Sequence, residues 1–136
     1  MIVLICLLPL KATAPGHGLN LFREEKTEPL TEAEAESLRL EPLIKAVTWV
    51  EVADGRDLYN EAENAVGWFQ IRQIRVDHYN YLTGSDYKLE DFYDYELSRE
   101  MFIYFARGKT FEQAAKDWNG SGVMTESYWQ KVKSAL

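Results

Sequence analysis

Glu51 is the residue of this 136-residue chain whose type and position best suit acid–base chemistry. On a helical wheel of the segment from Pro42 to Ala53, one face gathers four apolar residues, Leu43, Ile44, Val47 and Val50. Glu51 falls on that same face, between Ile44 and Val47. Burial there disfavours the charged form of a carboxyl group, so Glu51 should hold its proton near neutral pH, as a general acid must. The alternative is a helix-end glutamate whose side chain turns out into water.

Two later segments carry aromatic and amide side chains suited to sugar binding. They are Gly67-Trp68-Phe69-Gln70 and Trp118-Asn119-Gly120, and Tyr128 follows the second one. The rings of Trp68, Trp118, Tyr128 and the adjacent Trp129 could stack on the C–H face of a pyranose. The alternatives are that the rings belong to the core, as expected for Phe69, and that Gln70 is a buried structural amide.

The order of these motifs resembles the soluble lytic transglycosylase (SLT) domain. This goose-type-lysozyme-like family cuts the glycan strands of bacterial cell walls. Its Glu-Ser, Gly-Leu-Met-Gln and Ala-Tyr-Asn motifs correspond here to Glu51-Val52, Gly67-Trp68-Phe69-Gln70 and Asp117-Trp118-Asn119. The resemblance covers about residues 43–132 and implies a mostly α, lysozyme-like single domain with minor or no β structure.

The resemblance also implies the roles of individual residues. Glu51 is expected to be the single catalytic group, acting first as acid and then as base on the β-1,4 bond between MurNAc and GlcNAc of peptidoglycan. The expected substrate-binding residues are Gly67, Trp68, Phe69, Gln70, Trp118, Asn119 and Tyr128. No cofactor and no metal ion is expected, and neither His17 nor His78 has metal-ligand spacing to a second ligand.

Three departures from the family motifs bear on the activity. Val52 replaces the serine that usually follows the catalytic glutamate, and Trp118 replaces a tyrosine, exchanging a hydroxyl for an indole N–H that can only donate. Trp68-Phe69 replaces Leu-Met and enlarges both side chains. The first two departures keep open a non-catalytic glycan-binding or scaffolding domain.

The reaction type also stays open at this stage. A transglycosylase uses the sugar's own 6-hydroxyl and leaves a 1,6-anhydro end, whereas a hydrolytic muramidase uses water. A second carboxylate, which many glycosidases need, could come from the loop after Glu51, where the sequence offers Asp54, Asp57, Glu61 and Glu63.

Local signals predict the helices that would position these residues. Thr31-Glu32-Ala33-Glu34 is a capping box that opens a short helix to about Leu40, and Pro42 is expected to start the separate helix that carries Glu51. Asp54-Gly55 should end that helix, and residues 56–66 should form a polar loop.

Further helices are expected along the second half of the chain. One should run from Ile71 to Leu82 and stop at Gly84, and another should be capped by Asp94 and end at Gly108. The capping box at residues 110–113 should open a helix that ends at Asn119-Gly120, and a last helix should run from about residue 126 to residue 136. No segment alternates for long, so any sheet should be minor.

The N-terminus indicates an exported protein, and the charge is compatible with the glycan substrate that the resemblance implies. Residues 1–14, with an apolar run before Ala12-Thr13-Ala14, are expected to be a signal peptide, residues 15–30 a flexible lead-in and residues 31–136 the catalytic domain. Cys6 is the only cysteine and lies in the leader, so the mature chain should use no disulfide or thiol. The net charge of -7 argues against nucleic acid and anionic membrane surfaces as partners. Peptidoglycan strands in the periplasm or cell envelope are the expected partner, with no stable membrane insertion after leader cleavage and the oligomeric state undetermined.

Overall fold

The computed structural model describes residues 28–52 and 57–136. Its elements, in order, are α1 (Glu32–Val52), β1 (Tyr59–Asn60), β2 (Ala65–Val66), β3 (Ile71–Arg72), α2 (Gln73–Thr83), the 3-10 helix η1 (Leu89–Tyr93), α3 (Tyr95–Ala106), α4 (Phe111–Asn119) and α5 (Met124–Ser134). The prediction of a mostly α chain with minor β structure is therefore confirmed. The predicted leader and all but the last three residues of the predicted lead-in lie outside the described residues, as does the predicted helix stop at Asp54-Gly55.

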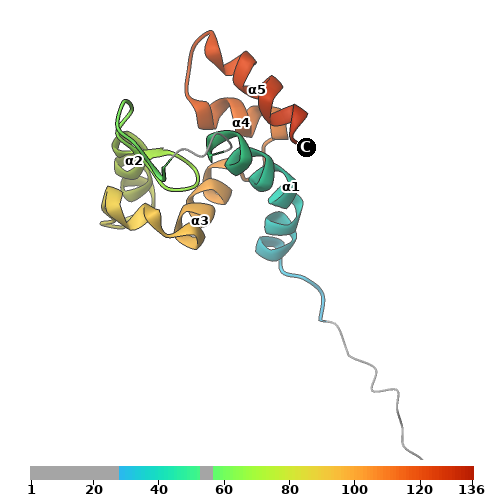
Figure 1. Cartoon of the computed structure of the whole chain (residues 1–136). Coiled ribbons are helices and arrows are strands. Elements are labelled where there is room, and N and C mark those ends of the chain that lie inside the picture. Colours follow the sequence, from blue (N-terminus) through green and yellow to red (C-terminus); the bar gives the residue numbers. More distant parts are fainter. Residues whose placement is uncertain (1–27, 53–56) are drawn as a thin grey trace, which may run out of the picture.

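Helix α1 is one continuous helix, so the prediction of two helices separated near Pro42 is wrong. The capping box at its start is confirmed, because Glu34 N donates to Thr31 Oγ1 at 3.3 Å and Thr31 N donates to Glu34 Oε2 at 2.8 Å. Pro42 removes one N–H from the helix interior. Buried residues lie on both sides of it, from Leu40 to Val47, and their common packing against the core holds the helix together across the proline. Figure 1 shows that α1 changes direction along its length.

The segment expected to be a polar loop contains two short strands. β1 pairs antiparallel with β2 in the register Tyr59↔Val66, and β2 pairs with β3 in the register Val66↔Ile71. β3 also takes the first two residues of the helix that was expected to start at Ile71. Each strand is two residues long, which is too short to show the alternation that identifies a strand in a sequence.

Several other predicted helix ends are confirmed, and the remaining ones differ by about two residues, since α3 ends at Ala106 rather than at Gly108. Gly84 adopts the left-handed conformation with φ of 71° after α2. Asp94 accepts a hydrogen bond from Leu97 N at 2.8 Å at the start of α3. Thr110 and Gln113 form the capping box of α4, which ends at Asn119. Helix α5 begins two residues before the predicted Glu126.

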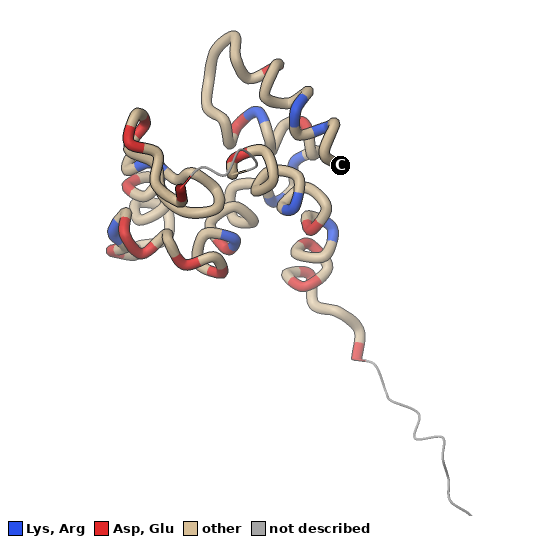
Figure 2. Tube along the Cα trace, in the orientation of Figure 1, with Lys and Arg blue, Asp and Glu red and all other residues tan. Residues whose placement is uncertain are grey.

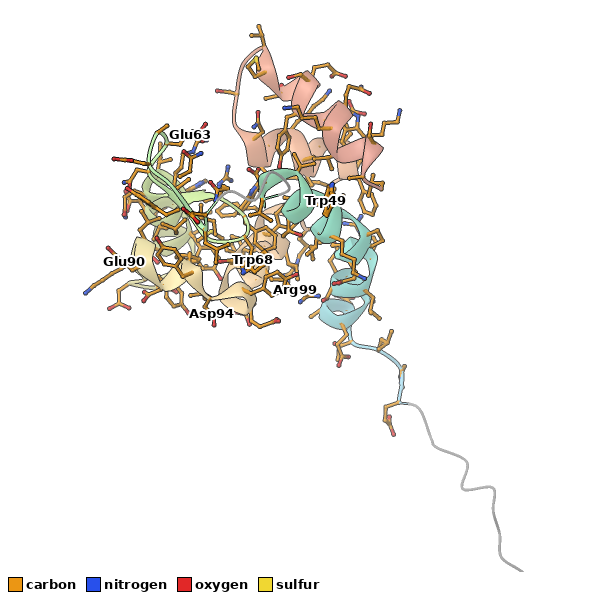
Figure 3. The ribbon with its side chains drawn as sticks, in the orientation of Figure 1. Trp49, Glu63, Trp68, Glu90, Asp94 and Arg99 are labelled. Atoms are coloured by element: carbon orange, nitrogen blue, oxygen red, sulfur yellow. The ribbon has the colours of Figure 1, made fainter. Side chains whose placement is uncertain are left out.

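One hydrophobic core joins the elements around the site. Its largest fully buried apolar side chains are Phe69, Phe92, Phe102, Leu40, Leu43, Ile44, Ile71, Met101, Val47, Val76 and Val132. In Figure 1 the strands, α2 and η1 lie on the left, and α4 and α5 lie at the upper right. Helix α1 packs against α3, α4 and α5. Arg99 of α3 braces α1 by donating to Ser37 Oγ at 2.8 Å and to Glu41 Oε2 at 3.0 Å (Figure 3). Across the described ranges no helix combines the length and apolarity needed to cross a membrane.

Candidate functional site

Glu51 and Tyr128 meet across the fold. Glu51 is half-buried on the last turn of α1, while Tyr128 is buried on α5. The Tyr128 hydroxyl donates a hydrogen bond to Glu51 Oε1 at 2.7 Å. The structure thus brings together two of the residues predicted from the sequence, and it places the carboxyl group of Glu51 beside a polar partner inside an otherwise apolar face.

The environment of Tyr128 keeps its hydroxyl protonated. Burial raises the pKa of Tyr128 well above 10, and the neighbouring Glu51 charge and the hydrogen bond to Glu51 raise it further, while the charge of Arg75 opposes them. Tyr128 is therefore a neutral hydrogen-bond donor at neutral pH. A tyrosine hydroxyl can also accept a hydrogen bond from a protonated carboxyl group. The pair can consequently accommodate Glu51 in either protonation state, which suits a group that gives and later takes a proton.

The other carboxylates considered from the sequence lie elsewhere. Asp57, Glu61 and Glu63 are exposed residues at the start and in the turn of the β1–β2 hairpin. Asp54 lies outside the described residues. Glu63 is labelled at the tip of the hairpin in Figure 3.

Gln70 is held in an unusual conformation. Its backbone has φ of 48°, in the left-handed region that non-glycine residues rarely adopt. Its side-chain Nε2 donates to Gly67 O at 3.0 Å, but its buried Oε1 has no hydrogen-bond partner among the residues that the structure describes. Backbone strain and an unpaired buried acceptor both cost free energy, and such features concentrate at functional sites.

Gly67 has a structural reason to be glycine. It adopts φ of 72°, and a Cβ at this position would overlap the backbone carbonyl oxygen of Phe92 in η1. The strand β2 and η1 can therefore approach closely only because residue 67 lacks a side chain. This contact accounts for Gly67 without a sugar beside it, so its predicted role in substrate binding stays a prediction.

The two aromatic residues of this segment face opposite ways. The Trp68 side chain is 40% exposed and contacts Tyr95 edge-on, with 6.2 Å between ring centroids. Phe69 is fully buried between Phe102 and Trp118. Phe69 is thus a core residue, as expected from the alternative to a role in sugar binding. Trp68 can reach a ligand from the surface (Figure 3).

Trp118 supports the site from the core. Its side chain is 6% exposed, and its Nε1 donates to Phe69 O at 3.1 Å, joining α4 to the segment before β3. Its ring contacts Phe102 edge-on at 4.9 Å. The only polar atom of the indole at position 118, where the family has a tyrosine, therefore donates to a backbone carbonyl. The next residue, Asn119, is half-buried, and its side-chain amide makes no hydrogen bond among the residues that the structure describes.

Arg75 is a residue that the sequence reasoning missed. Its Nη2 donates to Asp117 O at 3.1 Å and to Trp118 O at 2.8 Å, and its guanidinium lies 4.4 Å from the centroid of the Trp118 ring. Burial and the charge of Arg72 lower the pKa of Arg75 from its ordinary value. These contacts satisfy carbonyls at the C-terminal end of α4. No local signal marks this role, because the carbonyls and the arginine are 42 and 43 residues apart.

Within residues 28–52 and 57–136 no group of three or more metal-ligating side chains is placed to hold a metal ion. No protein-family model, curated protein or solved structure matches this chain. The function must therefore be inferred from the geometry around Glu51 and from the motifs.

Proposed function

We propose that this chain is a lytic transglycosylase with a lysozyme-like fold that cleaves the β-1,4 bond between MurNAc and GlcNAc in peptidoglycan. The observation that carries the proposal is the 2.7 Å hydrogen bond from Tyr128 to Glu51. It gives the one glutamate of the apolar helix face a neutral, buried partner and a defined orientation. The corresponding place of action is the periplasm or cell envelope, after export.

In the proposed reaction Glu51 acts twice. As a carboxylic acid it protonates the glycosidic oxygen, so that the bond between this oxygen and the MurNAc C1 breaks and GlcNAc leaves as an alcohol. As a carboxylate it then takes the proton from the MurNAc 6-hydroxyl, whose oxygen bonds to C1 and closes the 1,6-anhydro ring. Tyr128 can accept a hydrogen bond from the acid form and donate one to the carboxylate form, so the side chain of Glu51 stays oriented through both steps.

Two further features support a carbohydrate site. The strained backbone and unpaired Oε1 of Gln70 lie in the motif that follows Glu51. The exposed Trp68 ring of the same motif offers a face on which a sugar could stack. The mostly helical fold with one small antiparallel sheet is compatible with a lysozyme-like domain.

The decisive test compares Glu51→Gln with the wild-type protein on purified peptidoglycan. Wild type should clear a peptidoglycan-containing gel and release soluble muropeptides, and Glu51→Gln should do neither while keeping its helical circular dichroism. Glu63→Gln, an exposed position on the hairpin, is the matched control and should be as active as wild type. Undiminished activity of Glu51→Gln would show that Glu51 is not the acid. Mass spectrometry of the products separates 1,6-anhydro ends from the reducing ends of a hydrolytic muramidase.

A non-catalytic glycan-binding domain is the second candidate, and the Trp118 geometry favours it. The indole N–H is committed to Phe69 O, so residue 118 offers no hydroxyl to a substrate, and Val52 offers none either. This candidate predicts that peptidoglycan pulls down wild type and Glu51→Gln equally, with no soluble muropeptides after long incubation. Turnover that increases in Val52→Ser would instead support the enzyme with a weakened site.

A further inference from the structure

A cationic pocket lies between the start of α2 and the end of α4. It has a volume of about 620 Å³ and is lined by Arg72, Ile74, Arg75, His78 and residues 119–121. Its two walls are far apart in the sequence, and Arg72 Nη2 connects them by donating to Asn119 O at 3.4 Å. Arg75 connects them again through its hydrogen bonds to the Asp117 and Trp118 carbonyls.

The two arginines of this pocket form no ion pair within the part of the chain that the structure describes. No carboxylate there lies within 4 Å of the guanidinium of Arg72 or Arg75, whereas other basic side chains such as Lys109 and Lys116 form such pairs. Two acidic side chains of the helices that form the pocket have other partners. Asp117 pairs with Lys109 at 2.8 Å, and Asp77 accepts from Gln73 Nε2 at 2.8 Å.

This arrangement is unusual for an acidic chain. The net charge is -7, and acidic positions lie along the hairpin and η1 (Figure 2), yet two positive charges are held beside one another here. The two charges repel each other, and the charge of Arg72 contributes to the lowered pKa of Arg75. The charge of Asp117 acts on Arg75 in the opposite sense but less strongly than that of Arg72. Two like charges held together with so little compensation form a local field that attracts an anion.

The pocket also offers uncharged hydrogen-bonding groups. Within the described ranges the side chains of His78, Asn119 and Ser121 make no hydrogen bond to the protein. The exposed Arg72 guanidinium makes only one side-chain hydrogen bond to the described residues, the 3.4 Å contact with Asn119 O. A planar guanidinium matches the two oxygens of a carboxylate.

Arg75 connects the pocket electrostatically with the proposed catalytic pair. Its charge lowers the pKa of Tyr128, against the larger effects that raise it, and Tyr128 donates to Glu51. Peptidoglycan, unlike chitin, carries carboxylates close to its glycan strand, on the peptide stems and, where a stem has been removed, on the lactyl group.

We propose that the pocket formed by Arg72, Arg75 and Asn119 binds a carboxylate of the glycan substrate. This inference rests on the proposed function, since it names what distinguishes the substrate from other β-1,4 glycans. Arg72 is the residue to test, because it is exposed and its loss should leave the fold intact. Arg75 holds the end of α4, so its substitution would disturb Trp118 as well.

The experiment measures binding, so it does not depend on turnover. Isothermal titration uses the Glu51→Gln protein, alone and combined with Arg72→Gln, and three soluble tetrasaccharides. The first is a peptidoglycan fragment with intact stems, the second the same fragment after amidase treatment, with lactyl carboxylates only, and the third is chitotetraose, which has no carboxylate. Arg107→Gln, at an exposed position after α3, controls for the change in net charge.

Arg72→Gln should weaken the binding of a carboxylate-bearing fragment about tenfold, as expected for one charge-assisted hydrogen bond at a partly exposed site, and should leave chitotetraose unchanged. Weakening of the first fragment assigns the pocket to stem carboxylates, and weakening of the second assigns it to the lactyl carboxylate. Equal weakening for all three ligands, no weakening, weakening by Arg107→Gln to the same extent, or no binding of any ligand would overturn the inference. Failure of the proposed function would show separately, as absence of soluble muropeptides from wild type.

Discussion

Tyr128→Phe isolates the contribution of one hydroxyl group to the proposed reaction. The substitution removes the donor to Glu51 Oε1 and keeps the ring, which is 7% exposed and packs in the core. A hydrogen bond to a charged group contributes about 1.5–3 kcal/mol. Since Glu51 is half-buried, water can replace part of this interaction, and the lower end of the range applies. About 1.4 kcal/mol corresponds to a tenfold change in rate, so kcat should fall about tenfold.

The pH dependence provides a second readout for the same variant. The hydroxyl donates to Glu51 and so stabilises its carboxylate form. Without it, Glu51 should keep its proton to higher pH, and the basic limb of the pH–rate profile should move upward. The assay is release of soluble muropeptides across the pH range, with thermal unfolding to confirm that the variant is folded.

Tyr59→Phe is the matched control, because its hydroxyl donates to Asn64 Oδ1 at 3.2 Å on the exposed hairpin. It should change neither kcat nor the pH profile. If Tyr128→Phe keeps both the rate and the position of the basic limb of wild type, the hydrogen bond to Glu51 has no part in the reaction and the reasoning is refuted.

Three further predictions concern stability. Gly67→Ala should lower the free energy of unfolding in urea by about 2–5 kcal/mol, because its backbone is left-handed and its Cβ would overlap Phe92 O. Gly84 has nearly the same φ but open space around it, so Gly84→Ala should lower this free energy by only about 1–2 kcal/mol. Equal losses in the two variants would contradict the overlap. Because the pKa of Tyr128 is raised, the folded state holds a proton that the unfolded state loses above about pH 10. The stabilisation from this group should be fully present below that pH, and the free energy of unfolding should fall above it. Urea unfolding at about pH 8 and about pH 11 should show a smaller fall in Tyr128→Phe than in wild type. Pro42→Ala should restore a backbone hydrogen bond inside α1 and raise the free energy of unfolding by about 1–2 kcal/mol. A lower thermal midpoint would show instead that the core requires the geometry of the proline.

The helix ends that could be predicted from the sequence are those set by a few adjacent residues. Asp94, Thr110 and Gly84 act through hydrogen bonds or a backbone conformation within their own turn. Pro42 was misinterpreted because its local signal is a helix start, and the opposing influence is the burial of α1 on both sides of it. That burial depends on helices that follow much later in the chain.

The site could be predicted only in part for the same reason. The apolar face that contains Glu51 is a local pattern, and the half-buried position of Glu51 is consistent with it. Tyr128 could be nominated as an aromatic residue near the motifs, but its hydrogen bond to Glu51 spans 77 residues. The roles of Arg75, of the Phe92 carbonyl beside Gly67 and of the Trp118 indole arise from tertiary contacts that leave no periodicity in the sequence.

The distance along the chain between Glu51 and Tyr128 has a consequence for the order in which this part of the fold assembles. Helix α1 is synthesised before α5, so a nascent chain contains Glu51 before it contains Tyr128. Their hydrogen bond forms only when α5 packs against α1 and α4. Under the proposed function, the C-terminal helix must therefore be folded before the pair can act on a glycan.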